Sequence, residues 1–219
     1  RVVHYLKREL SKEQGRGRFS DIDYKREKIV RRKSSNYKFQ YNRLFMAYGL
    51  DPKEQKNKEL IDSAVDMYHE LRDKNFRPIK KVQATLSYFE SKGVANVLIT
   101  NGDPVKQREK LKYLGIEGKF KVVVASGDAD VKLEKPNPGI FEITFRRIKE
   151  NGFPGLKRRQ CVYIGDRPED IIGAHNAGWG MAIRIRKGPY RNLMSEIEPS
   201  YVVKSPSDVQ NLLKPMIGA

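Results

Sequence analysis

Three clusters of polar residues in the second half of the chain carry the side chains that a phosphate site needs. The clusters are Thr100, Asn101 and Gly102 in "VLITNGDP", Lys135 in "EKPNPGIF", and Asp166 with Asp170 in "GDRPED". A hydroxyl and turn amides can hold phosphoryl oxygens, an ammonium group offsets their charge, and carboxylates bind Mg²⁺ through oxygen. Together these residue types predict a site for a phosphorylated small molecule, with Mg²⁺ as cofactor.

The segments around these clusters alternate between helix and strand patterns. Apolar runs predict buried strands at 94–100, 121–126 and 160–165 and short late strands at 181–185 and 201–203, and helices are predicted between them. Asp103 and Asn137, each followed by Pro, are typical of helix N-caps. Strands separated by helices predict a parallel sheet covered on both faces, with its site at the carboxyl ends of the strands. We therefore expect Thr100, Lys135 and Asp166 to lie within a few ångströms of one another.

The first 75 residues have a different pattern. Apolar residues at three- and four-residue spacing predict helices at 2–10, 36–50 and 58–74, and residues 11–35 are expected to form a polar, basic connection. We expect two domains, a helical one over residues 1–75 and an α/β core over residues 76–219. The basic run from Lys25 to Lys33 is expected to be a solvated surface.

"VLITNG", "KPNPGIF" and "YIGDRPEDIIGAHNAG" resemble, in order and spacing, the second, third and fourth motifs of the haloacid dehalogenase (HAD) superfamily. The resemblance covers about residues 80–205 and is closest to phosphatase-like members with a helical cap. It implies a Rossmann-like α/β fold and Mg²⁺-dependent phosphomonoester hydrolysis through an aspartyl-phosphate. The cap, residues 1–75, would cover the phosphate and select the leaving group.

The resemblance also implies a role for each polar residue. Thr100 would bind the transferred phosphoryl group with the help of Asn101 and Gly102. Lys135 would be the catalytic residue that stabilises the charge of the nucleophile and of the phosphoryl group. Asp166 would bind Mg²⁺ directly, and Asp170 would support it.

The first motif of the superfamily, a strand ending in Asp-x-Asp that supplies the nucleophile, has no counterpart in this sequence. Asp21-Ile22-Asp23 has the right letters, but the polar stretch "KEQGRGRFS" before it predicts a solvated loop. In the superfamily the missing strand lies between the strands predicted at 94–100 and 160–165. We expect residues ahead of Arg1, or another chain, to supply it, and we expect the 219 residues alone to hydrolyse no phosphomonoester.

The composition leaves two alternatives to an enzyme open. The formal net charge is +17 and the sequence pI is about 9.9, which favours polyanionic partners. The chain is therefore either a phosphatase, an inactive HAD-like subunit of a basic RNA-containing assembly such as an organellar ribosome, or a module that binds a phosphorylated ligand without turnover. The single Cys161 predicts a reducing compartment, cytoplasmic or organellar matrix, and no apolar run predicts a membrane span.

Overall fold

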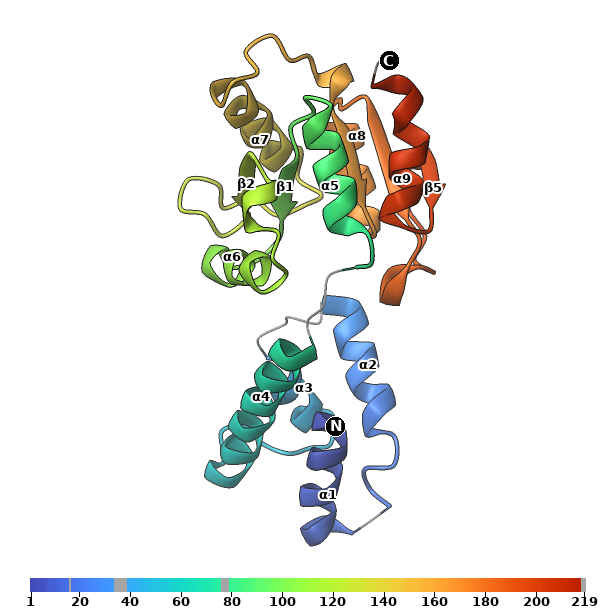
Figure 1. Cartoon of the computed structure of the whole chain (residues 1–219). Coiled ribbons are helices and arrows are strands. Elements are labelled where there is room, and N and C mark those ends of the chain that lie inside the picture. Colours follow the sequence, from blue (N-terminus) through green and yellow to red (C-terminus); the bar gives the residue numbers. More distant parts are fainter. Residues whose placement is uncertain (16, 34–38, 76–78, 218–219) are drawn as a thin grey trace. The chain divides into compact units, whose positions relative to one another are not determined.

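The chain divides into two compact units, Arg1–Phe76 and Arg77–Ala219 (Figure 1). This computed structural model describes residues 1–15, 17–33, 39–75 and 79–217. Among the described residues, no helix combines the length and the apolar character that a membrane crossing requires. Whether the first unit acts as a cap stays a prediction.

The first unit is helical throughout its described elements. They are α1 (Val2–Gln14), α2 (Ile22–Lys33), α3 (Gln40–Met46) and α4 (Gln55–Asn75). The expectation of a polar connection over 11–35 is wrong for its second half, because α2 lies there. Ile22 is fully buried, and Ile29, two turns later, packs against the same core, so one narrow apolar stripe holds this charged helix to the unit.

Asp21-Ile22-Asp23 lies at the start of α2 rather than in an open loop. The hydroxyl of Tyr48 donates a 2.5 Å hydrogen bond to the Asp21 carboxylate, and this bond lowers the pKa of Asp21. Phe19 packs on the Tyr48 ring with a centroid distance of 4.9 Å. The pair of carboxylates therefore belongs to the packing of the helical unit, and the described residues 1–15 and 17–20 ahead of it contain no strand.

The second unit has the predicted α/β architecture. Its elements are α5 (Val82–Ser91), β1 (Val97–Thr100), α6 (Pro104–Tyr113), β2 (Val122–Ala125), α7 (Pro138–Glu150), β3 (Val162–Gly165), α8 (Pro168–Asn176), β4 (Met181–Ile185), β5 (Tyr201–Val203) and α9 (Pro206–Leu213). Short 3₁₀ turns lie between them at Glu117–Lys119, Arg158–Gln160 and Gly188–Tyr190, and another, Lys214–Met216, follows α9. Asp103 and Asn137 cap α6 and α7 as predicted, since each accepts a backbone N–H bond.

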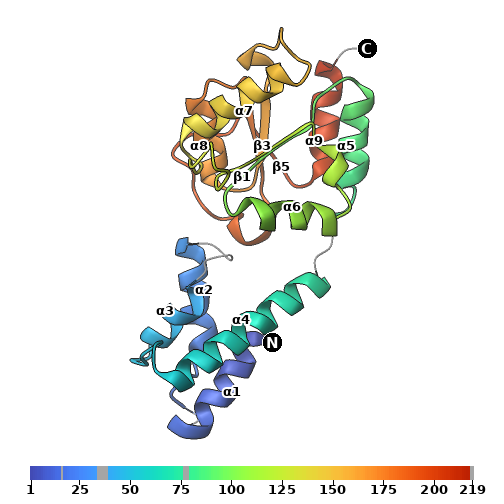
Figure 2. The ribbon, with the colours of Figure 1, turned by 90° about the vertical axis from the view of Figure 1, so that its left-hand side faces the viewer.

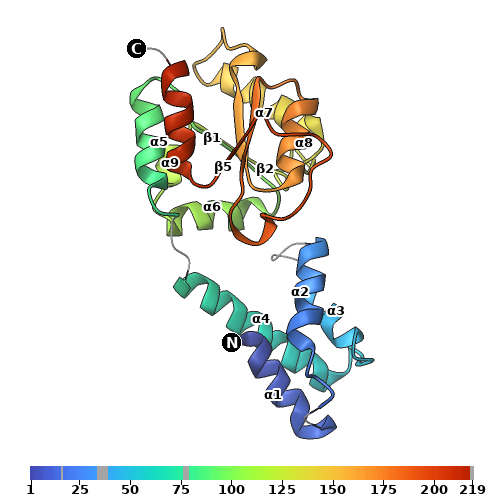
Figure 3. The same ribbon diagram turned by 90° about the vertical axis from the view of Figure 1, so that its right-hand side faces the viewer.

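The strands lie between two helical layers (Figures 2 and 3). Helices α7 and α8 cover one face, where Ile140, Phe141 and Ile171 pack with residues of four strands. Helices α5 and α9 cover the other face and meet Ile183 of β4. All strand pairs of the described residues are parallel, so the carboxyl ends lie at one edge within each ladder, and Lys135 bonds both Ile99 near the end of β1 and Asp170 after β3.

The strands form two separate ladders, β1–β2 and β3–β4–β5, and β1 does not pair with β3. The carbonyls of Asn96 and Thr100 accept bonds from residues flanking β2, so the Ile99 carbonyl between them points away from β2. That carbonyl accepts instead from the hydroxyl of Tyr163, a β3 residue, at 3.3 Å. Ile164, in the middle of β3, is 39% exposed.

These two open edges face each other inside one apolar core, and we call the place between them the central position. The sequence predicted that a strand would separate β1 from β3. Direct pairing of the two, which would exclude such a strand, is not seen in the described residues. An intervening strand would bond the peptide groups that both edges leave without a partner strand.

We predict that amide hydrogen exchange in the 219-residue chain follows this pattern. The amides of Ile99 and Ile164, which face the central position, should exchange at least about tenfold faster than those of Leu98 and Tyr163, which face a partner strand. Residue-resolved NMR measures the rates, and the neighbouring amides in each strand serve as internal controls. Equally slow exchange at all four amides would show that β1 and β3 close on each other.

Candidate active site

Lys135 is the centre of a buried polar junction at the carboxyl edge of the sheet. Its ammonium lies 2.6 Å from Asp170 Oδ1, 2.9 Å from the Tyr163 hydroxyl and 3.2 Å from the Ile99 carbonyl oxygen. The Lys135 and Asp170 side chains are only 13% and 5% exposed. Burial by itself lowers the pKa of Lys135, but Tyr163 and Asp170 outweigh it, and the pKa lies above its ordinary value.

The backbone of Lys135 is fixed by Asn101, just beyond β1. The Asn101 side chain donates to the Lys135 carbonyl at 3.1 Å and accepts from the Lys135 N–H at 2.9 Å. These two hydrogen bonds resemble those between paired strands, and they hold the loop before α7 against the end of β1. Asn101, predicted to bind phosphate, has both ends of its amide engaged in this way.

Thr100 and Gly102 flank Asn101, and their backbones make different hydrogen bonds. Thr100 is the last residue of β1 and is half-buried, with its carbonyl accepting from Ser126 N. The Gly102 N–H donates to the Ser126 hydroxyl at 2.8 Å. The Asn101 amide is thus engaged by Lys135, and Gly102 has no side chain. The Thr100 hydroxyl is therefore the side-chain group of this cluster that is left to bind a phosphate.

The two carboxylates after β3 have different surroundings. Asp170 is 3% exposed, and besides Lys135 it accepts from the backbone N–H groups of Asp166 and Arg167, at 3.1 and 3.0 Å. Asp166 is half-buried, and burial together with the nearby charge of Asp170 raises the pKa of its carboxyl. Within the described structure no side chain bonds the Asp166 carboxylate.

Gly165 between β3 and Asp166 is required by this packing. A Cβ added there would lie 2.3 Å from Asp170 Oδ2, far inside van der Waals contact. Any larger residue at 165 would displace the carboxylate that pairs with Lys135.

These observations decide how the described residues fit Mg²⁺. The ion takes six oxygen ligands, several of them waters, and is held in proteins by carboxylates. Both oxygens of Asp170 are engaged inside the protein, which leaves Asp166 as the candidate ligand. The described residues contain no group of three or more His, Cys, Asp or Glu placed to bind a metal, so among them Asp166 would be a single carboxylate ligand.

The sequence did not single out Tyr163 or Ser126 for the site. Tyr163 is buried, its pKa is raised by that burial, and its hydroxyl joins Lys135, Asp170 and Ile99. Ser126 is 5% exposed and holds the turn after β1. The sequence could have indicated both residues by their position, because each is a polar residue at or near the end of a predicted buried strand, as Thr100 is.

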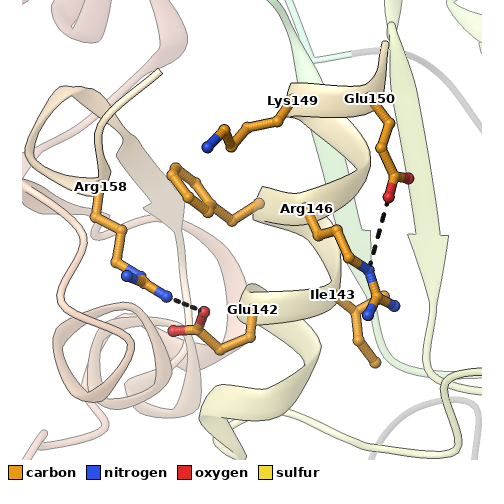
Figure 4. A pocket seen from close by; sticks show the side chains of 7 residues that line it. Glu142, Ile143, Arg146, Lys149, Glu150 and Arg158 are labelled. Atoms are coloured by element: carbon orange, nitrogen blue, oxygen red, sulfur yellow. Dashed lines mark hydrogen bonds and ion pairs between the residues drawn. The ribbon is translucent and has the colours of Figure 1, made fainter. Parts of the chain in front are cut away.

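A shallow hollow of about 440 Å³ lies elsewhere, on the outer side of α7 (Figure 4). In it Arg158 pairs with Glu142, and Arg146 lies 4.0 Å from Glu150. Its charges are largely neutralised within the protein, and none of the residues of the polar junction lines it. This hollow is therefore not where the chemistry-bearing residues meet.

The family model described as "Haloacid dehalogenase-like hydrolase" matches residues 21–183 of the chain. The chain belongs to this family. The "Glyceraldehyde 3-phosphate phosphatase" of Methanopyrus kandleri is 32% identical over 192 residues, 86% of this chain and 77% of the relative. The human "N-acylneuraminate-9-phosphatase" is 31% identical over 159 residues, 72% of this chain and 60% of the relative.

Solved structures agree with the fold. A HAD phosphatase from Thermococcus onnurineus is similar with a TM-score of 0.57 and 25% identity, covering 97% of this chain and 86% of that structure's chain. The resemblance inferred from the three motifs, to phosphatase-like HAD proteins, is thus confirmed, as is the α/β fold class.

We predict that breaking the Lys135–Asp170 pair strongly destabilises the protein. Asp170→Asn leaves a buried ammonium without its counter-charge and should lower the free energy of unfolding by about 3–5 kcal/mol. Urea denaturation followed by circular dichroism measures the change. The matched control is Glu150→Gln, which removes one charge from an exposed pair on α7 and should change stability by about 0.5 kcal/mol or less. Equal effects of the two substitutions would contradict the role given to the pair.

Proposed function

We propose that this chain is the substrate-binding part of a Mg²⁺-dependent phosphatase that hydrolyses phosphomonoesters of small molecules through an aspartyl-phosphate. The observation that carries the proposal is the buried, charged Lys135 at the carboxyl edge of the sheet, close to the Thr100 end of β1 and to the start of α8. A cation held rigidly in a site that excludes water stabilises phosphoryl charge far better than a cation in water.

In this proposal each residue has one task. The Thr100 hydroxyl and the Lys135 ammonium bind phosphoryl oxygens, and Asp170 holds Lys135 in place. Asp166 is a ligand of Mg²⁺, which when bound offsets the charge of the phosphate. Asn101 and Gly102 position Thr100 and Lys135 through the bonds described above.

The nucleophile enters on a strand at the central position. An aspartate at the carboxyl end of such a strand would lie between Thr100 and Asp166. Its carboxylate oxygen would form the new bond to phosphorus while the ester P–O bond breaks and the leaving oxygen takes a proton. Water then attacks the phosphorus of the aspartyl-phosphate, which releases inorganic phosphate and restores the carboxylate.

The same strand would also change the bonding of Lys135. At present its three N–H donors are used by Asp170, Tyr163 and the Ile99 carbonyl. A strand beside β1 would bond the Ile99 carbonyl through its own backbone N–H. One ammonium donor would then be released toward a phosphoryl oxygen.

The relatives support a phosphorylated small molecule as substrate, since the two named above carry sugar phosphates in their names. None of the comparisons supports the alternative of an inactive subunit in an RNA-containing assembly, which rests on the absent Asp-x-Asp motif and the net charge of +17 and stays a prediction. The assignment to a reducing compartment likewise stays a prediction from the single Cys161.

We predict that the 219-residue chain alone releases no phosphate from p-nitrophenyl phosphate with Mg²⁺. A chimera that adds, ahead of Arg1, an apolar strand ending in Asp-x-Asp should become active, because it supplies the missing nucleophile. Changing the first of these aspartates to Asn should lower its rate about a thousandfold or more. Thr100→Val in the chimera should lower the rate by about 100-fold.

Two results would contradict the proposal. One is Mg²⁺-dependent hydrolysis by the unmodified chain that Asp166→Asn abolishes, since the nucleophile would then lie within these residues. The other is a chimera that folds, as judged by circular dichroism and NMR, but stays inactive.

A further inference from the structure

The segment after β4 is strongly basic and is anchored by a buried arginine. Between Asp170 and Glu196 the sequence contains no Asp or Glu, but it contains four Arg or Lys: Arg184, Arg186, Lys187 and Arg191. Arg184 is the largest fully buried side chain, at 1% exposure. Its Nη2 donates to the carbonyls of Tyr190 at 3.1 Å and Leu193 at 2.6 Å, and its Nε has no partner in the described structure.

A buried guanidinium without a carboxylate partner is costly, so its position needs a reason. Arg184 binds main-chain carbonyls only, and those carbonyls belong to the loop that carries the other basic residues. Arg167 adds a second anchor, since its guanidinium carbon lies 4.7 Å from the centre of the Tyr190 ring. The loop at 186–191 is thus held in place from two sides.

This loop lies beside the candidate active site. In the β3–β4 ladder Gly165 pairs with Arg184, so Asp166 and Arg186 leave the sheet at the same edge. Figures 1 and 3 show the segment around Gly188–Tyr190 at the end of the strands where α6 begins, which is the carboxyl end. Arg186, Lys187 and Arg191 are exposed there, and no carboxylate of the described residues pairs with them.

We propose that the loop at 186–191 binds a second anionic group of the substrate, distant from the transferred phosphate. This inference rests on the proposed function and names its substrate class, a small phosphomonoester with a carboxylate or another phosphate at its far end. Neighbouring strands are about 4.8 Å apart, so β4 lies about 10 Å from the central position, two strands away. A three-carbon phosphomonoester together with an arginine side chain spans that length.

Binding measurements separate this inference from the phosphate site itself. Calorimetric titration at low ionic strength would compare 3-phosphoglycerate with glycerol 3-phosphate, which differ in the charge at the far end. We expect 3-phosphoglycerate to bind about tenfold tighter, which is the effect of one charge-assisted hydrogen bond. In Arg186→Ala/Arg191→Ala the preference should fall to about twofold or less, while glycerol 3-phosphate binds almost as before.

The matched control is Lys92→Ala/Lys121→Ala, which removes the same charge from exposed residues preceding β1 and β2, at the opposite edge. It should leave the preference unchanged. Thr100→Val, in contrast, should weaken both ligands equally, because it acts on the shared phosphate.

Three results would overturn the inference. If the parent chain binds both ligands equally and Thr100→Val weakens both, the phosphate site stands but the second subsite does not exist. If the preference survives in the Arg186/Arg191 variant, another group provides it. If neither ligand binds, the proposed phosphate site fails and the subsite fails with it.

Discussion

The buried ion pair between Lys135 and Asp170 is the interaction on which the candidate site depends. It joins the loop before α7 to the first turn of α8, and Asp170 also bonds the amides of Asp166 and Arg167. Two desolvated charges at 2.6 Å are stable only while both are present and correctly placed. The carboxyl ends of β1 and β3, which belong to separate ladders, are therefore held together by this polar junction and not by strand pairing.

Because the central position is open, the residues suited to bind a phosphate and the carboxylate that would attack it lie on different segments. The residues suited to hold a phosphate are on elements that the described chain forms by itself, because α7 and α8 bury residues of β1 and β3 in a common core on one face of the strands. The attacking carboxylate would have to arrive on a further strand. Bonding of that strand to the Ile99 carbonyl would both complete the sheet and release a donor of Lys135, so folding and activation of the site would be one event.

Much of the fold and part of the site could be predicted from the sequence. Apolar runs and the Asp103 and Asn137 caps specify local structure directly, and the order of strands and helices specifies which strand ends meet. Helix α2 was missed, because its segment is mostly charged and, among its described side chains, Ile22 and Ile29 are the ones that pack in the apolar core. The roles of Tyr163 and Arg184 were not foreseen, because Lys135 and the carbonyls that Arg184 bonds lie outside the regular helices and strands that periodicity predicts.

The most direct test of this account is a crystal structure of the chain grown with Mg²⁺ and tungstate, a heavy mimic of phosphate. The account predicts tungstate in contact with the Thr100 hydroxyl at the carboxyl edge of the sheet, beside Lys135, whose three donors stay with Asp170, Tyr163 and the Ile99 carbonyl. Tungstate bound instead at the hollow beside α7, with no density near Thr100 and Lys135, would contradict the assignment of the site.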